Sequence, residues 1–187
     1  MIFLLYLLSP TISIGQTKPV PIISSFYPGF STDTGIYNES IIGSWTSQGL
    51  VEEIKIESLD DGSYHVFSVD NSTWNFFQIS FKAKLFRIEN TLFVDLIPMG
   101  AFFSDQLGFQ SHTFAIVEIE TNSIKVSVFD PYFVSKYLTK NSDRISILRK
   151  DVYILVTEPS SVIQRILIDL TKSSESIMET IVFQRKK

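Results

Sequence analysis

The chain has 187 residues, of which 16 are basic and 20 acidic, so its formal net charge is −4. Hydrophobic residues make up 44% and charged residues 19%, which excludes intrinsic disorder, and the length suits one domain. The negative charge gives no basic surface for a nucleic acid or an anionic membrane. The absence of cysteine excludes disulfides, thiolate metal sites and thiol catalysis.

Residues 1–15 predict a secretory signal peptide. The apolar stretch 2–8 is too short to cross a bilayer, which takes roughly 20 residues. Ser13 and Gly15 supply small side chains for cleavage before Gln16. The alternative is a buried N-terminal strand. We expect a secreted or periplasmic protein without stable membrane insertion, and without cysteine it has no N-terminal lipid anchor.

Residues 16–40 are rich in proline, glycine, serine and threonine. Such a composition breaks helices and strands, because proline lacks a backbone donor and glycine lacks conformational restraint. We therefore expect an N-terminal arm that lies on the surface and forms no packed element. The domain proper is expected to span residues 41–187.

From Ile42 onward the hydrophobic pattern has a period of two, which is typical of strands with one face toward a core. Asp60-Asp61-Gly62, Glu89-Asn90 and Thr121-Asn122-Ser123 have the composition of hairpin turns. The expected strands include residues 53–57, 64–69, 77–85, 92–97, 112–120, 124–129, 145–157 (with a break near 149–151) and 181–185. This spacing predicts an all-β, antiparallel, up-and-down barrel of eight or nine strands.

Two helices interrupt the strands. Asp130-Pro131 predicts a short helix that ends near Leu138. Pro159 opens a longer, amphipathic helix before the last strand, and its apolar stripe is typical of a helix that docks on a sheet. The stripe comprises Val162, Ile163, Ile166, Leu167 and Leu170.

Gly43-Ser44-Trp45 opens the first strand of this region. The Gly-x-Trp step resembles the first signature of the lipocalins and the wider calycin group. In that family the Trp fills the closed end of the barrel and an Arg on the last strand lies across it, so the resemblance implies a structural pair of Trp45 and Arg185. Two further stretches, 81–114 and VFDPYFVSKYL at 128–138, resemble exported bacterial lipocalin-like proteins of unknown function.

Asp95 and the two histidines, His65 and His112, are the candidates for chemistry. Asp95 shares a face with Phe93 and Ile97, and is either an interior polar group or an outward carboxylate near Arg87 or a lysine; the second is favoured. His112 shares strand parity with Phe114 and Ile116. The sequence spacing of the histidines does not suggest a metal site, and no Gly-x-Ser-x-Gly elbow supports a hydrolase.

Residues 99–110 form a long loop with four large apolar side chains, including Phe102, Phe103 and Phe109. Loops normally avoid such residues. The loop either packs over the barrel as an auxiliary core or acts as a lid that contacts an apolar ligand or a partner protein.

The sequence therefore predicts a non-enzymatic, exported protein that binds a small apolar or amphipathic ligand inside a barrel, without a cofactor or metal. The expected ligand contacts are Phe81, Leu85, Val94, Phe102, Phe103, Phe109 and His112. The alternative is an envelope structural or protein-interaction module, with a filled barrel and an exposed aromatic loop. The large number of phenylalanines, 16, favours a filled interior and so favours this alternative.

Overall fold

The computed structural model describes residues 22–30, 35–48, 53–69, 80–99, 111–150 and 153–186. The predicted signal peptide and the aromatic residues Phe102, Phe103 and Phe109 lie outside this part of the chain.

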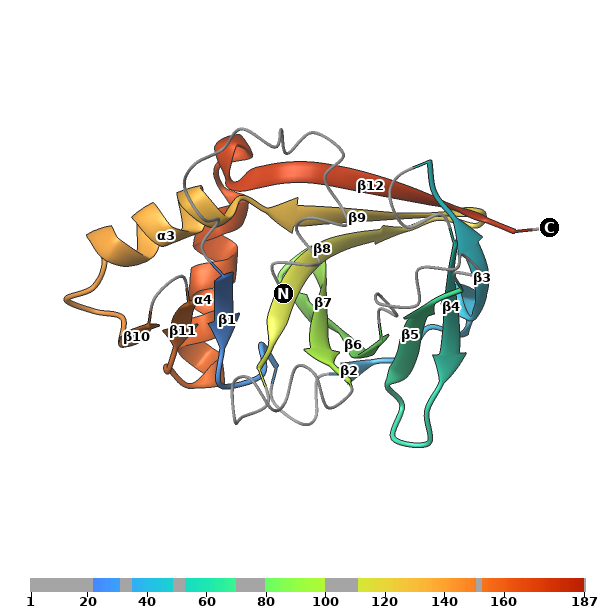
Figure 1. The fold of residues 1–187 in the computed structure, drawn as a ribbon, viewed down its shortest axis with the longest axis horizontal. Coiled ribbons are helices and arrows are strands. Elements are labelled where there is room, and N and C mark those ends of the chain that lie inside the picture. The colour runs from blue at the N-terminus through green and yellow to red at the C-terminus, as the bar shows by residue number, and fades with distance from the viewer. Residues whose placement is uncertain are drawn as a thin grey trace.

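The described residues form a closed antiparallel barrel of eight strands, which confirms the predicted all-β barrel. Strands β3 to β9 follow one another around the ring, β6 pairs directly with β7, and β12 closes the ring between β9 and β3 (Figure 1). A two-residue strand, β2 (Gly35–Ile36), pairs with Leu85 and Phe86 of β6, beyond the residues of β6 that pair with β5. The barrel strands are β3 (Gly43–Thr46), β4 (Glu53–Ser58), β5 (Tyr64–Ser68), β6 (Ser80–Ile88), β7 (Thr91–Pro98), β8 (Thr113–Ile119), β9 (Ser123–Phe129) and β12 (Ile177–Arg185).

A second layer lies against one side of the barrel (Figure 1). It contains β1 (Ile22–Ser25), which pairs in parallel with β11 (Tyr153–Val156), and β10 (Ile147–Lys150), which pairs antiparallel with β11. Two helices, α3 (Pro131–Lys140) and α4 (Ser160–Thr171), belong to the same layer. Asp130 caps α3, because its carboxylate accepts a hydrogen bond from the Phe133 amide at 2.7 Å.

Two sequence-based expectations need correction here. The segment 16–40 was expected to hold no packed element, yet it contributes β1, whose Ser24 and Ser25 are buried, and β2. The strands within 145–157 were counted toward the barrel, but they pair with β1 in a separate sheet. Both errors share one cause, because the pairing of β1 with β11 joins segments about 130 residues apart and leaves no local sequence pattern.

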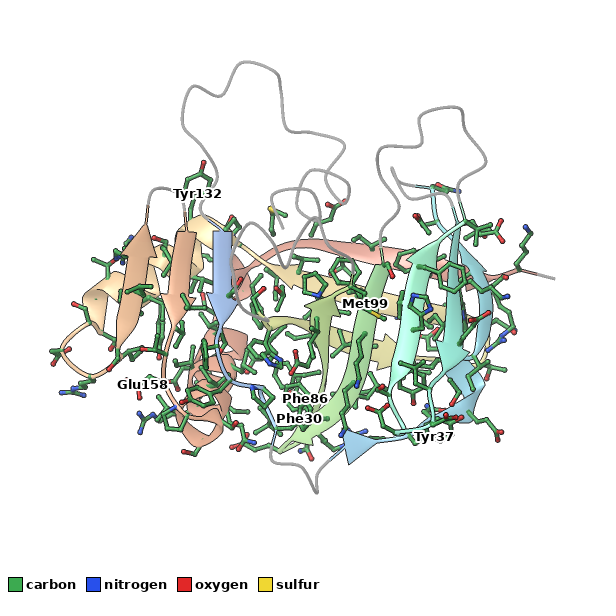
Figure 2. All side chains as sticks on the ribbon, turned by 60° about the horizontal axis from the view of Figure 1, so that its bottom comes forward. Phe30, Tyr37, Phe86, Met99, Tyr132 and Glu158 are labelled. Carbon is green, nitrogen blue, oxygen red and sulfur yellow. The ribbon has the colours of Figure 1, made fainter. Side chains whose placement is uncertain are left out.

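The layer covers large apolar side chains that β6 to β8 carry on their outer face as well as on their inner face. Ala83, Leu85 and Val94 point into the barrel, whereas Phe86 and Phe93 belong to a second core outside it. Phe30 packs on Phe86 with ring centroids 5.7 Å apart (Figure 2). From α4 the second core receives Ile163, Ile166, Leu167 and Leu170, four of the five residues of the predicted stripe.

Gly29 allows the segment 22–30 to lie directly on the barrel wall. A Cβ atom at this position would lie 2.7 Å from Cζ of Phe86 and 2.8 Å from Cε1 of Phe114. We expect Gly29→Ala to lower the free energy of unfolding by about 1–3 kcal/mol, because both rings belong to the second core and yield with difficulty. Chemical denaturation measures this loss.

Gly35→Ala is the matched control, since its new Cβ would meet the flexible end of the Lys84 side chain. Its cost should be clearly smaller. Equal losses for the two variants would contradict the close approach at Gly29.

Candidate ligand-binding cavities

One end of the barrel is closed by the segment that precedes β3. Asn38 caps the 3-10 helix η1 (Glu39–Ile41), and Ile41 packs into the barrel core. The backbone amide of Asn38 donates to the hydroxyl of Tyr64 at 2.6 Å, and Tyr64 is fully buried. Tyr37, labelled in Figure 2, stacks on Tyr64 from outside with ring centroids 5.6 Å apart.

Trp45 and Arg185 meet at this closed end. The indole is fully buried and donates from Nε1 to the carbonyl of Ile41 at 2.8 Å. The guanidinium carbon of Arg185 lies 4.2 Å from the centroid of the indole, within the range of a cation–π contact. The same guanidinium donates to the carbonyls of Ser40 and Ile42. The pair therefore ties the last strand to the segment that plugs the barrel.

The barrel interior holds a cavity of about 130 Å³. Two of its lining residues, Ala83 on β6 and Ala115 on β8, have small side chains, which leaves space between the larger ones. Of the predicted ligand contacts, Phe81, Leu85 and Val94 line this cavity. The number of phenylalanines favoured the alternative of a filled interior, but Phe86 and Phe93 lie in the second core, while Phe81 and Phe183 line the cavity.

His112 lies outside the barrel cavity. Its ring shares a face with Asp95 on the outer side of the wall, where His112 is 8% exposed and Asp95 is fully buried. Nδ1 of His112 lies 2.9 Å from each carboxylate oxygen of Asp95. The outward interpretation of Asp95 thus agrees with the structure, but the carboxylate is buried and its partner is His112 rather than Arg87 or a lysine.

The carboxyl of Asp95 is in an unusual electrostatic environment. Burial raises its pKa, while the hydrogen bond and charge of His112 and a hydrogen bond from the Gly29 amide act in the opposite direction. The segment that carries Gly29 is held nearby by a backbone bridge, in which the amides of Ser25 and His112 each donate to the carbonyl of the other at 2.9 Å. The polar pair therefore joins the barrel wall to the second layer.

A second cavity, of about 100 Å³, lies between the barrel wall, β1 and the helices. Its polar lining residues on β1 and beside β8 are Ser24, Ser25, His112 and Thr113, and α3 and α4 supply apolar residues. Thr113, Phe114 and Val128 line both cavities, so the two are neighbours. Sequence reasoning missed this cavity, although the shared parity of His112 and Phe114 placed both on one face of β8.

Within the described residues, no cluster of three or more His, Asp or Glu side chains is arranged to hold a metal ion. No helix in this part of the chain is long and apolar enough to span a membrane.

These observations define the class of the protein as a closed antiparallel barrel with an apolar interior cavity and a packed side layer. Comparisons with family models, with curated proteins and with solved structures found no match.

The closed end yields one prediction. Arg185→Ala should lower the free energy of unfolding by about 1–3 kcal/mol, because it removes the contact with Trp45 and the hydrogen bonds to Ser40 and Ile42. Thermal and chemical denaturation measure the change. Arg144→Ala is the control, since the Arg144 side chain is 80% exposed and should change stability by less than about 0.5 kcal/mol. Similar effects of the two substitutions would contradict a structural role for Arg185.

The buried pair yields another prediction. His112→Ala should cost about 3–5 kcal/mol of stability, because Asp95 is left buried without its partner. Adding Asp95→Asn in the same chain should recover part of this loss, since the amide carries no charge. His65→Ala, at the half-buried histidine that hydrogen-bonds Ser80 at 2.9 Å, should cost much less. If Asp95→Asn gives no recovery, the carboxylate is not the source of the loss.

Proposed function

We propose that this protein is an exported, calycin-like binding protein that holds a small apolar or amphipathic molecule in its barrel, without catalysing a reaction. The single observation that carries the proposal is the apolar cavity of about 130 Å³ at the centre of a closed barrel. Protein interiors contain few voids larger than a water molecule, so a space of this size suggests an occupant.

The energetics of the cavity support an occupant. A hydrophobic molecule that fills the cavity regains contacts that the lining side chains otherwise lack. The volume also limits the ligand, because pockets for drug-sized molecules have about 300–1,000 Å³, whereas a cavity of about 150 Å³ binds benzene.

Three features support the proposal that the barrel is calycin-like. The Gly-x-Trp step opens the first barrel strand, Arg185 of the last strand stacks on Trp45, and α4 precedes that strand. The proposal that the protein is exported rests on residues 1–15, whose composition is typical of a signal peptide. Together these features favour a ligand-carrying role in the periplasm or outside the cell.

Filling the cavity tests the proposal. We expect benzene and n-hexane to bind the native protein and to shift the methyl NMR signals of Ala83 and Ala115. Ala115→Leu should weaken both affinities at least tenfold while the free energy of unfolding stays equal or rises, because the new carbons occupy the void. Val182→Leu, on the exposed outer face of β12, is the control and should leave both affinities unchanged.

A complementary measurement is native mass spectrometry of protein purified from its own host, in which we expect a co-purified small apolar molecule. An empty native protein that also fails to bind benzene and n-hexane would favour the alternative, an envelope structural or interaction module.

A further inference from the structure

The barrel cavity alone offers little to a polar head group. Among the described residues that line it, Tyr64 and Thr113 are the ones with a hydroxyl. The hydroxyl of Tyr64 accepts from the Asn38 amide at the closed end. A polar group buried without a partner costs several kcal/mol in an apolar medium, so an amphipathic ligand needs a polar neighbour elsewhere.

Such a neighbour lies on the other side of one shared wall. Thr113, Phe114 and Val128 line both cavities, and they stand where β8 begins and β9 ends, at the end of the barrel opposite Trp45. Beyond this wall the second cavity reaches His112. A chain-like molecule that passes these side chains would therefore extend from the apolar interior to a buried polar group.

The geometry of His112 suits a hydrogen bond to a ligand. Asp95 holds Nδ1 through both of its carboxylate oxygens, which fixes the orientation of the ring, as a second partner does for functional histidines. Nε2 is the second polar atom of the ring, and a ligand hydroxyl that reaches it can form a hydrogen bond with it. Ser24 and Ser25 line the same cavity, and the backbone bridge between Ser25 and His112 keeps this corner rigid.

The charged groups near His112 indicate which charge the head group of a ligand can carry. Asp95 is a fully buried carboxylate directly behind His112, and the described lining of the second cavity contains no lysine or arginine. Besides His112, the positive charge of Lys84 acts on Asp95, and the Lys84 ammonium lies over the ring of Phe30. A ligand carboxylate would also have to lose its hydration in a cavity with a mostly apolar lining, which costs far more than the transfer of a neutral hydroxyl, and Asp95 would repel it.

We propose that the ligand is a neutral amphipathic alcohol, whose hydroxyl hydrogen-bonds His112 in the second cavity and whose hydrocarbon chain lies in the barrel cavity. This inference rests on the proposed function and adds the chemical class of the ligand and the position of its head group. His112, which the sequence suggested as a ligand contact, takes this role from outside the barrel wall.

Three probes of equal chain length test the inference by NMR: n-hexane, 1-hexanol and hexanoate. The methyl signals of Ala83 and Ala115 report on the barrel, and the ring signals of His112 report on the head group. We expect 1-hexanol to shift both sets, n-hexane to shift only the alanine signals, and hexanoate to bind at least tenfold more weakly than 1-hexanol. No substitution is needed for this measurement, so it does not depend on the folding of a variant.

Substitution supplies the second arm. His112→Gln should weaken 1-hexanol binding about tenfold and leave n-hexane affinity unchanged, while His65→Gln, at the other histidine of the chain, should change neither affinity. If n-hexane shifts the alanine signals but 1-hexanol leaves His112 unshifted, the head-group site is wrong and the barrel site stands. Tighter binding of hexanoate with a shift at His112 overturns the choice of an alcohol. Absence of any shift with all three probes overturns the barrel site as well.

Discussion

Burial of large apolar side chains on the outer face of β6, β7 and β8, in addition to those on the inner face, is the constraint on which the rest of the structure depends. A barrel strand commonly alternates between an apolar inner face and a wet outer face. Here the outer face carries Phe86, Phe93 and Phe114, which would otherwise expose a large apolar patch to solvent. The second layer removes that patch from water. The 22–30 segment and the insertion between β9 and β12, with α3, α4, β10 and β11, are therefore parts of one domain rather than attachments to a barrel.

Asp95 stands on this dry face, where an unpaired carboxylate would be very unfavourable. His112 and the Gly29 amide are arranged around it, one from the barrel and one from the covering segment. A shift of β7 by one residue would turn Asp95 into the barrel cavity and away from both partners. The polar pair thus adds specificity that apolar packing lacks, because phenylalanine contacts tolerate small displacements and a buried charge does not. The same pair provides an oriented histidine beside a cavity.

The parts of the fold that could be predicted are those whose signals lie within short stretches of the sequence. Alternation along residues 77–85 and turn residues such as Gly62 indicate hairpins, and hairpins in succession make a meander. The meeting of Trp45 with Arg185 followed from a family resemblance, since 140 residues separate them. The pairing of β1 with β11 has no comparable local signal. The Asp95–His112 contact is an intermediate case. The alternation of the sequence indicated on which face of its strand each residue lies, but only the register of β7 on β8 brings the two residues together.

The division of the interior space into two small cavities has a consequence for specificity. Side chains from eight strands fill most of a barrel of this size, and small residues such as Ala83 and Ala115 leave one gap. The outer cavity arises separately, where helices with their own side chains meet a curved wall. A ligand that occupies both must displace the half-buried ring of Phe114 or the smaller Thr113 and Val128. A thin, flexible chain can do so at low cost, whereas a rigid ring system cannot, so the partition favours linear molecules over bulky ones of equal hydrophobicity.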